Sequence, residues 1–164
     1  MEEVIRNMAH NYKKIKLFVY DFDGVMTDNT FILDCDGNEQ VVLNRSDGLA
    51  VAEIKKKGFM QLILSSENSE IINRRANKLK IGSIKGADNK LLILTNYLKS
   101  NNLNFNEILY VGNDINDLDA MSNAKIKICP SDAAIEIKNI SDIILQTPGG
   151  KGVIREILRL LISK

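Results

Sequence analysis

The chain has 164 residues, and its 22 lysines and arginines against 21 aspartates and glutamates give a formal net charge of +1. Because this near neutrality provides no general positive field, we expect no binding to nucleic acid or to an anionic membrane surface. Hydrophobic residues make up 45% of the sequence, and the length suits one domain of ordinary size. A single folded domain over residues 1–164 is therefore expected.

The residue types present limit the chemistry further. His10 is the only histidine, and Cys35 and Cys129 each stand alone, so a Cys/His zinc site and a catalytic triad with a mid-chain histidine are excluded. Apolar runs are far shorter than the roughly 18 residues of a membrane-spanning helix, and the acidic start is unlike a secretory leader. We expect a cytoplasmic protein whose chemistry uses carboxylates, lysines, hydroxyls or a metal ion.

The first half of the chain alternates short apolar runs with polar loops. Residues 31–33 and 40–43 flank an Asp-Gly turn, which predicts a β-hairpin within residues 29–44. The other elements predicted here are a buried strand over 16–20, a helix ending at the lysines before Gly58, a buried strand over 59–64 and an amphipathic helix over 69–79.

The second half continues the alternation. The helices predicted here cover 90–98, 117–121, 133–138 and 153–162, and the strands cover 108–111, 126–128 and 143–145. Strand and helix alternate almost throughout, which predicts an α/β fold with a doubly wound, Rossmann-like parallel sheet. Residues 1–14 have mixed polar character and are expected to form an N-terminal arm.

Polar side chains follow three of the predicted parallel strands. Asp21 and Asp23 come after the first strand, Ser65 after the next, and Asn113-Asp114 after a later one. Open α/β sheets bind ligands at the carboxyl ends of their strands, so these residues are expected to converge on one crevice. Two carboxylates as close as those of Asp21 and Asp23 would repel each other, and a bound cation would offset this repulsion.

Four short motifs occur in order at these strand ends. They are the segment Asp21-Phe-Asp-Gly-Val25, the hydroxyl of Ser65, the ammonium of Lys90 and the acidic segment Gly112-Asn-Asp-Ile-Asn-Asp117. Together they resemble the DxDx[TV], Ser/Thr, Lys and GDxxxD-like motifs of the haloacid dehalogenase-like phosphohydrolases. The resemblance implies a phosphatase that works through an aspartyl-phosphate intermediate.

The resemblance also implies a role for each matched residue. Asp21 would attack the phosphorus atom, and Asp23 would protonate the leaving oxygen and then deprotonate the attacking water. Ser65 and Lys90 would bind the nonbridging phosphate oxygens. The implied cofactor is Mg²⁺.

The expected metal ligands are Asp21, Asp23 through its backbone carbonyl, Asn113 and Asp114, with Asp117 behind them. Most members of the family carry Gly-Asp where this chain has Gly112-Asn113. An amide oxygen can still bind Mg²⁺ but brings one negative charge less, so weaker metal binding is expected. Asn113 in place of the usual aspartate also leaves open that the site is weakly active or inactive.

Many family members carry a cap domain over the site, but the segments between these motifs leave no room for one. Further segments resemble the capless, tetrameric 3-deoxy-D-manno-octulosonate 8-phosphate phosphatases and the related nonulosonate (sialic acid-type) 9-phosphate phosphatases. These segments are 23–28, 45–48, the Arg74-Arg75 pair and 149–152. The resemblance implies a homotetramer in which the 29–44 hairpins form an intersubunit barrel and neighbouring subunits cover the active site.

The implied substrate is the terminal phosphate of a 2-keto-3-deoxy sugar acid. The octulosonate enzymes typically have Ser-Gly-Arg at the second motif, whereas Ser65-Ser-Glu67 together with Lys78 resembles the nine-carbon branch. The octulosonate 8-phosphate and the nonulosonate 9-phosphate therefore both remain possible substrates. An alternative function is a weakly active or inactive module that associates with or regulates an acylneuraminate cytidylyltransferase.

Three further residues are candidates for substrate binding. Arg75, beside Arg74, could hold a carboxylate bidentately or could be an ordinary intersubunit or surface charge. Asp47 could assist a neighbouring site or act as a helix N-cap. Lys151, in the Gly-Gly-Lys-Gly segment, could reach a phosphate or sugar or belong to a flexible lead-in to the last helix.

Overall fold

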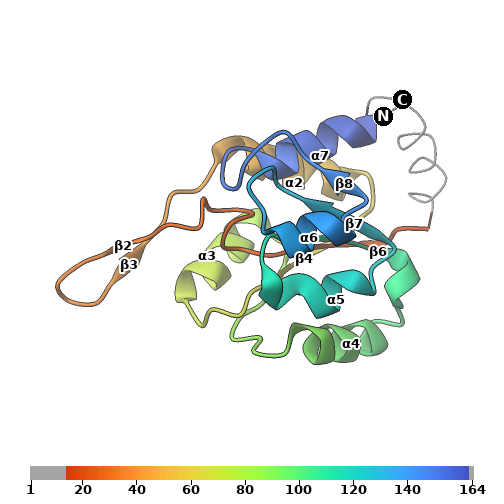
Figure 1. Ribbon diagram of the computed structural model, residues 1–164, viewed down its shortest axis with the longest axis horizontal. Coiled ribbons are helices and arrows are strands. Elements are labelled where there is room, and N and C mark those ends of the chain that lie inside the picture. Colours follow the sequence, from red (N-terminus) through yellow and green to blue (C-terminus); the bar gives the residue numbers. More distant parts are fainter. Residues whose placement is uncertain (1–13, 163–164) are drawn as a thin grey trace.

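The computed structural model describes residues 14–162, so the N-terminal arm expected over residues 1–14 lies, apart from Lys14, outside the described residues. A parallel sheet forms the centre (Figure 1), with the strand order β5-β4-β1-β6-β7-β8. The strands are β1 (Leu17–Tyr20), β4 (Met60–Leu64), β5 (Gly82–Ile84), β6 (Ile108–Val111), β7 (Ile126–Cys129) and β8 (Ile143–Ile144). The chain winds outward from β1 in both directions, which confirms the doubly wound α/β fold.

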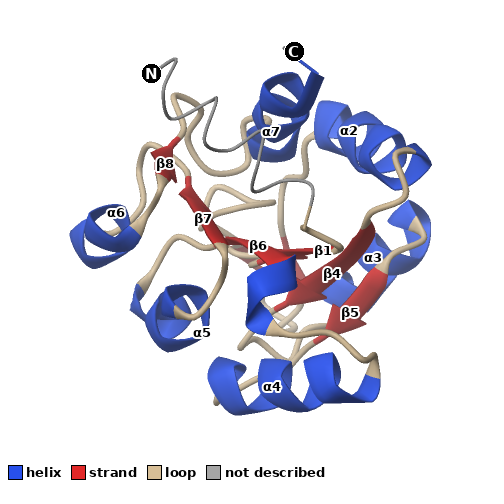
Figure 2. Ribbon diagram, turned by 90° about the vertical axis from the view of Figure 1, so that its right-hand side faces the viewer, coloured by secondary structure: helices blue, strands red, loops and turns tan. Residues whose placement is uncertain are grey.

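Helices cover both faces of this sheet (Figure 2), with α2, α3 and α7 on one face and α4, α5 and α6 on the other. The helices are α2 (Arg45–Lys56), α3 (Glu70–Leu79), α4 (Lys90–Ser100), α5 (Leu118–Ser122), α6 (Ile135–Ile140) and α7 (Val153–Ile162), with 3₁₀ turns η1 (Phe105–Glu107) and η2 (Ile115–Asp117). Because side chains alternate along a strand, Phe18 and Tyr20 enter one core and Leu17 and Val19 the other.

The predicted hairpin is present as β2 (Ile32–Leu33) and β3 (Glu39–Gln40), which pair antiparallel. The Asp34 carboxylate accepts hydrogen bonds from the backbone of Asp36 and Asn38 and thereby forms the turn. Figure 1 shows the hairpin extending away from the sheet on the side of α3. Its strands are shorter than the predicted 31–33 and 40–43, since only these two pairs are in register.

One predicted helix boundary was wrong. The helix predicted over 133–138 begins at Ile135, because the backbone N–H groups of Ala133 and Ala134 donate to Pro130 and Asn113 instead. The helix predicted near 117–121 is present as α5, and the 3₁₀ turn η2 precedes it, capped by the side chain of Asp114. No helix among the described residues is long and apolar enough to span a membrane.

Candidate active site

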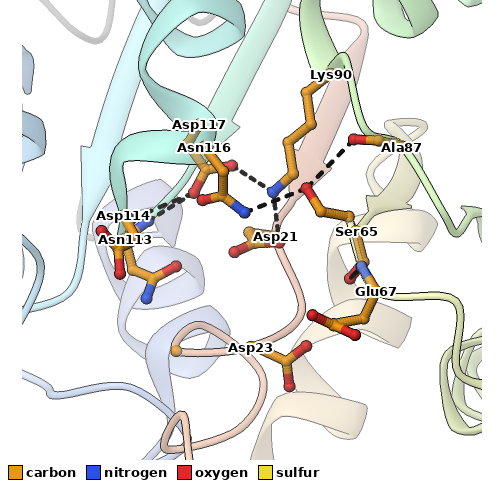
Figure 3. Close-up of polar contacts among 12 residues, drawn as sticks. Asp21, Asp23, Ser65, Glu67, Ala87, Lys90, Asn113, Asp114, Asn116 and Asp117 are labelled. Carbon is orange, nitrogen blue, oxygen red and sulfur yellow. Dashed lines mark hydrogen bonds and ion pairs between the residues drawn. The ribbon is translucent and has the colours of Figure 1, made fainter.

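The carboxyl ends of three adjacent strands bring the predicted motifs together (Figure 3). Asp21 follows β1, Ser65 follows β4, and Asn113 follows β6, while Lys90 reaches in from the first turn of α4. The order of the strands places β1 between β4 and β6, so the chain reverses its direction of winding at this point. Side chains distant in the sequence therefore meet at the switch point of the sheet.

Lys90 is the centre of a buried charge network. Its Nζ atom lies 2.7 Å from Oδ1 of Asp21 and 2.7 Å from Oδ1 of Asp117, and the three residues are at most 3% exposed. Although burial lowers the pKa of Lys90, the two carboxylates outweigh it and raise that pKa above its ordinary value. The side chain is therefore a fixed ammonium that points at Asp21.

Asp117 orients both Lys90 and the loop after β6. Its Oδ1 atom also accepts a hydrogen bond from the hydroxyl of Tyr110 at 2.8 Å, and its Oδ2 atom accepts one from the backbone of Asn113 at 2.9 Å. Gly112 leaves room for this carboxylate, since a Cβ atom there would lie 2.7 Å from Cγ of Asp117. Asp117 thus connects Lys90, Tyr110 and the loop after β6.

The Asp21 carboxylate lacks sufficient positive charge in its surroundings. Burial, together with the negative charge of Asp117, raises its pKa to about 8, and the ion pair with Lys90 only partly opposes this rise. A bound cation would stabilise the ionised form.

Asp23 is only half-buried and faces the cavity mouth. The Thr27 hydroxyl donates to its Oδ1 atom at 3.3 Å and so orients the carboxyl group. Burial raises the pKa of Asp23, and the nearby carboxylates of Glu67 and Glu39 raise it further, against the opposing effects of Thr27 and Lys90. Asp23 can therefore hold a proton more readily than an exposed aspartate, as a general acid requires.

Ser65 is buried, and its hydroxyl accepts a hydrogen bond from the backbone N–H of Glu67 at 3.2 Å. The next residue, Ser66, donates to the carbonyl of Ala87 and accepts a hydrogen bond from the side-chain amide of Asn116. These contacts connect the loop after β4 to the loops before α4 and after β6. They hold the rim of the crevice together.

The donor set around Asp21 fits a hard divalent cation. Oδ1 of Asn113 is buried and has no hydrogen-bond partner, whereas such atoms are nearly always satisfied in proteins. The loop of Gly24 fits closely against this side chain, since a Cβ atom on Gly24 would lie 1.9 Å from Nδ2 of Asn113. Carboxylate, amide and carbonyl oxygens are the ligands that Mg²⁺ prefers.

No group of three His, Cys, Asp or Glu side chains in the described part of the chain has the arrangement of a metal site. Two of the expected ligands, the amide of Asn113 and the backbone carbonyl of Asp23, are not of these side-chain types. Asp114 is exposed, and its Oδ1 atom accepts a hydrogen bond from the backbone of Ile115 at 2.7 Å. The unsatisfied oxygen of Asn113 is thus the stronger structural sign of a cation.

Asp21, Asp23 and Ser65, three of the residues predicted for catalysis, line a cavity of about 270 Å³. The predicted residues Glu67, Asn113 and Asp114 also line it. Sequence reasoning assigned no role to the four other residues in this lining, namely Asn29, Ser66, Ile115 and Asn116. Asn116 lies inside the fourth motif, so its position in that motif was a signal available in the sequence.

The structure does not bring Arg75 and Asp47 to this cavity. The guanidinium of Arg75 is buried against α2 and donates to the backbone carbonyl of Asn44 at 3.0 Å. Asp47 is buried beneath the start of α7 and accepts a hydrogen bond from the backbone of Arg155 at 2.9 Å. The N-cap of α2 is Asn44, so the predicted capping role of Asp47 was wrong.

Lys78 and Lys151 are both exposed and lie outside the lining of the catalytic cavity. The Nζ atom of Lys151 lies 3.1 Å from Oδ2 of Asp28, at the end of the loop that carries Asp23. The backbone N–H of Gly150 donates to the carbonyl of Val25 in the same loop. The segment before α7 therefore supports the catalytic loop from behind.

Comparison with known proteins agrees with this geometry. The model of the haloacid dehalogenase-like hydrolase family matches residues 4–157. The chain belongs to this family. It is an enzyme of the hydrolase class, and the resemblance inferred from the four motifs is confirmed.

Several relatives are similar along nearly the whole chain. A HAD family hydrolase of Streptomyces avermitilis has 36% identity and a TM-score of 0.87, over 91% of this chain and 86% of that one. The Moraxella catarrhalis 3-deoxy-D-manno-octulosonate 8-phosphate phosphatase, whose crystal structure contains magnesium, phosphate and KDO, has 30% identity and a TM-score of 0.91, over 99% and 92%. The enzyme of the same name from Haemophilus influenzae is 29% identical over 95% of this chain and 87% of its own.

Proposed function

We propose that this chain is a divalent-metal-dependent phosphatase that hydrolyses the terminal phosphate of a 2-keto-3-deoxy sugar acid. The observation that carries the proposal is the buried arrangement of Lys90 on Asp21, beside the half-buried Asp23 and the orphaned oxygen of Asn113. The relatives named for this activity are similar over nearly the whole chain, which supports the same chemistry here.

Asp21 is the nucleophile in this proposal. Its Oδ1 atom is held by Lys90, which leaves Oδ2 to attack phosphorus and form an aspartyl-phosphate while the ester oxygen departs. Lys90 and the hydroxyl of Ser65 lie where they can donate to the nonbridging phosphate oxygens, whose charge is redistributed in the transition state. The Lys90 ammonium is already oriented by Asp117, so little reorganisation is needed during the reaction.

Asp23 acts as the acid and then as the base. Its raised pKa favours the protonated form that gives a proton to the leaving oxygen. The resulting carboxylate then takes a proton from the water that attacks the aspartyl-phosphate. The Thr27 hydroxyl keeps the carboxyl group in one orientation for both steps.

Asp21, Asn113, the backbone carbonyl of Asp23 and Asp114 would hold the metal ion. Mg²⁺ bound there would supply positive charge between the nucleophile and the phosphate, which otherwise repel each other. Mg²⁺ is the proposed ion, and the magnesium ion in the crystal structure of the M. catarrhalis relative supports it. The amide at position 113 gives the site one negative charge less than a carboxylate would, so the binding of Mg²⁺ is proposed to be weak.

The finer part of the proposal is whether the substrate has eight or nine carbon atoms. The named relatives favour 3-deoxy-D-manno-octulosonate 8-phosphate. Glu67, which lines the catalytic cavity and takes the place of the arginine typical of the octulosonate enzymes, favours a nonulosonate 9-phosphate. Arg75, Lys78, Asp47 and Lys151 stay predictions as substrate-binding residues. Of the four, only the exposed Lys78 and Lys151 lie where they can reach a neighbouring subunit's site, since Arg75 and Asp47 are buried.

We also propose a homotetramer assembled through the hairpin. Phe31, Ile32, Leu33 and Val42 are each 58–68% exposed on or beside the hairpin. Apolar side chains gathered on a projecting element are typical of protein contacts. Sedimentation velocity of the wild type should give a tetramer, and Ile32→Asp should give smaller species with an unchanged far-UV circular dichroism spectrum. A monomeric wild type would contradict this part of the proposal.

The experiment that tests the function is a phosphate-release assay of the purified protein with Mg²⁺. The eight-carbon and nine-carbon sugar-acid phosphates are compared by kcat/KM, with p-nitrophenyl phosphate as a general phosphatase substrate. A sugar-acid phosphate should be hydrolysed far better than p-nitrophenyl phosphate. Failure to release phosphate from any substrate would contradict the proposal and favour the cytidylyltransferase-associated module.

A further inference from the structure

The hydroxyl of Tyr110 is a polar group inside an otherwise apolar strand. Tyr110 lies on β6, is fully buried, and packs in the core between the sheet and the helices α4 and α5. A phenylalanine has the same ring and would fill this space without a polar atom. The hydroxyl thus adds nothing to the apolar packing, and burying it costs free energy unless it is hydrogen-bonded.

This hydroxyl contacts the charge network at Asp117. It donates to Oδ1 of Asp117 at 2.8 Å, and the same atom accepts a hydrogen bond from Nζ of Lys90 at 2.7 Å. The other oxygen, Oδ2, accepts hydrogen bonds from the backbone N–H groups of Asn113 at 2.9 Å and Asp114 at 3.5 Å. Donors from the core, from α4 and from the loop after β6 therefore hold both oxygens of this carboxylate.

The position of Asp117 decides where the ammonium of Lys90 lies. The Lys90 side chain enters from α4 and ends between Asp117 and Asp21 (Figure 3), so its direction depends on the place of Oδ1 of Asp117. Without the Tyr110 hydroxyl, Oδ1 would be held by the ammonium alone among the described side chains, and the two groups could shift together. The hydroxyl is thus a fixed point for the ion pair.

Tyr110 stays a donor under ordinary conditions. Burial, together with the negative charges of Asp117 and Asp21, raises the pKa of its phenol well above the ordinary value. The hydroxyl therefore keeps its proton. A hydrogen bond that it donates to an ionised carboxylate is stronger than one between neutral groups.

We propose that Tyr110 is a positioning residue: it holds Oδ1 of Asp117 in place and thereby keeps the Lys90 ammonium directed at the substrate's phosphate. This inference rests on the proposed function. Tyr110 lies outside the lining of the catalytic cavity, so its effect passes through Asp117. Because a displaced ammonium stabilises the transition state less well, the effect belongs to kcat rather than to KM.

Tyr110→Phe tests this contact. It should lower kcat at least about fivefold, as expected for removing one hydrogen bond to a charged group, while KM stays within twofold. The loss should be the same for the sugar-acid phosphate and for p-nitrophenyl phosphate, because Lys90 binds the phosphate group that both substrates share.

Tyr20→Phe is the matched control. Tyr20 is equally buried, lies on the adjacent strand β1, and donates from its hydroxyl to Oε1 of Gln61 at 2.9 Å. Both variants should lower the urea midpoint of unfolding, since each loses a buried hydrogen bond, but Tyr20→Phe should keep kcat within twofold. The pair separates positioning from a general loss of stability.

A double variant tests whether Tyr110 acts through Asp117. In Asp117→Asn the uncharged amide no longer forms an ion pair with Lys90, so the hydroxyl has no ion pair left to position. Adding Tyr110→Phe to this variant should therefore change kcat less than twofold. A loss of fivefold or more in that background would overturn the route through Asp117.

The outcomes separate this inference from the function itself. A Tyr110→Phe enzyme that loses less than fivefold in kcat, or no more than Tyr20→Phe loses, would overturn the positioning role. A loss on one substrate alone would also overturn it, because the effect would then not lie at the shared phosphate. A wild type that releases phosphate from neither substrate would instead overturn the proposed function.

Discussion

The candidate active site and the hairpin differ in how far the single chain buries their side chains. Asp21, Lys90 and Asp117 are 0–3% exposed and hold one another through ion pairs of 2.7 Å. On the hairpin, Glu39 is exposed, and Phe31 is 58% exposed. The charged network is thus preorganised inside the protomer, whereas the hairpin leaves its side chains on the surface.

The difference has a physical origin. A buried charge must be paired, so the network around Lys90 is fixed by the fold itself and loses little freedom during the reaction. Exposed charges interact weakly across water and leave their side chains mobile. Substitutions in the two regions should therefore differ greatly in effect.

The largest effect is expected for Asp21→Asn. Replacing the nucleophile should lower kcat for phosphate release by at least about 10³-fold, because an amide cannot form the aspartyl-phosphate. The control is Asp36→Asn, which neutralises an exposed aspartate in the hairpin turn and should retain activity. An Asp21→Asn enzyme with more than a tenth of wild-type kcat would show that another group attacks phosphorus.

Asp117→Asn should have the next largest effect. It removes one of two carboxylates on the buried Lys90 and should lower the free energy of unfolding by about 3 kcal/mol, measured in urea, and kcat by about 100-fold. Asp119→Asn, on the exposed side of α5, should change the free energy of unfolding by less than about 0.5 kcal/mol. Equal stability of these two variants would mean that the buried network is not held by this charge.

Asn113→Asp should strengthen the binding of Mg²⁺ about tenfold, since it adds a negative charge beside the orphaned amide oxygen. Isothermal titration calorimetry with Mg²⁺ alone measures this without reference to activity. Asn123→Asp adds the same charge at an exposed position just after α5 and should leave the affinity unchanged. Unchanged affinity in Asn113→Asp would exclude residue 113 as a ligand.

The smallest effect is expected for Glu156→Gln. The Glu156 carboxylate accepts hydrogen bonds from the backbone of Gln146 and Thr147, and although partial burial opposes them, its pKa lies below the ordinary value. The substitution should lower stability at pH 7 by about 1 kcal/mol. Because the folded-state pKa is lowered, this difference should be full above pH 4.5 and shrink as the pH falls further, as thermal melts at pH 7 and pH 3.5 would show. A difference that grows on acidification would contradict this role.

The sequence predicted the sheet and the motifs well because both depend on local patterns. Buried parallel strands appear as continuous apolar runs, such as residues 16–20 and 108–111, and amphipathic helices such as α3 appear as a period near 3.6. The ends of α6 and of the hairpin strands were predicted less well. They depend on hydrogen bonds to distant backbone groups, such as that from Ala134 to Asn113, which leave no local pattern.

Within the site, the sequence identified Asp21, Ser65 and Lys90 as partners but could not show what holds them. Tyr110 donates a hydrogen bond from its hydroxyl to Asp117, but in the sequence it is only one residue of an apolar strand. Asn116 and Ser66 meet although they lie 50 residues apart. Such pairings follow from the packing of neighbouring loops and become visible only when the strands are placed side by side.

The amino-acid sequence by itself determined the family, the doubly wound sheet and the residues available for phosphate chemistry. Only the tertiary structure decided which of two adjacent arginines is buried. Successive residues on a helix point about 100° apart, so one of Arg74 and Arg75 had to face away from α2 once α3 was packed. Arg75 donates to the backbone carbonyl of Asn44, and Arg74 is exposed.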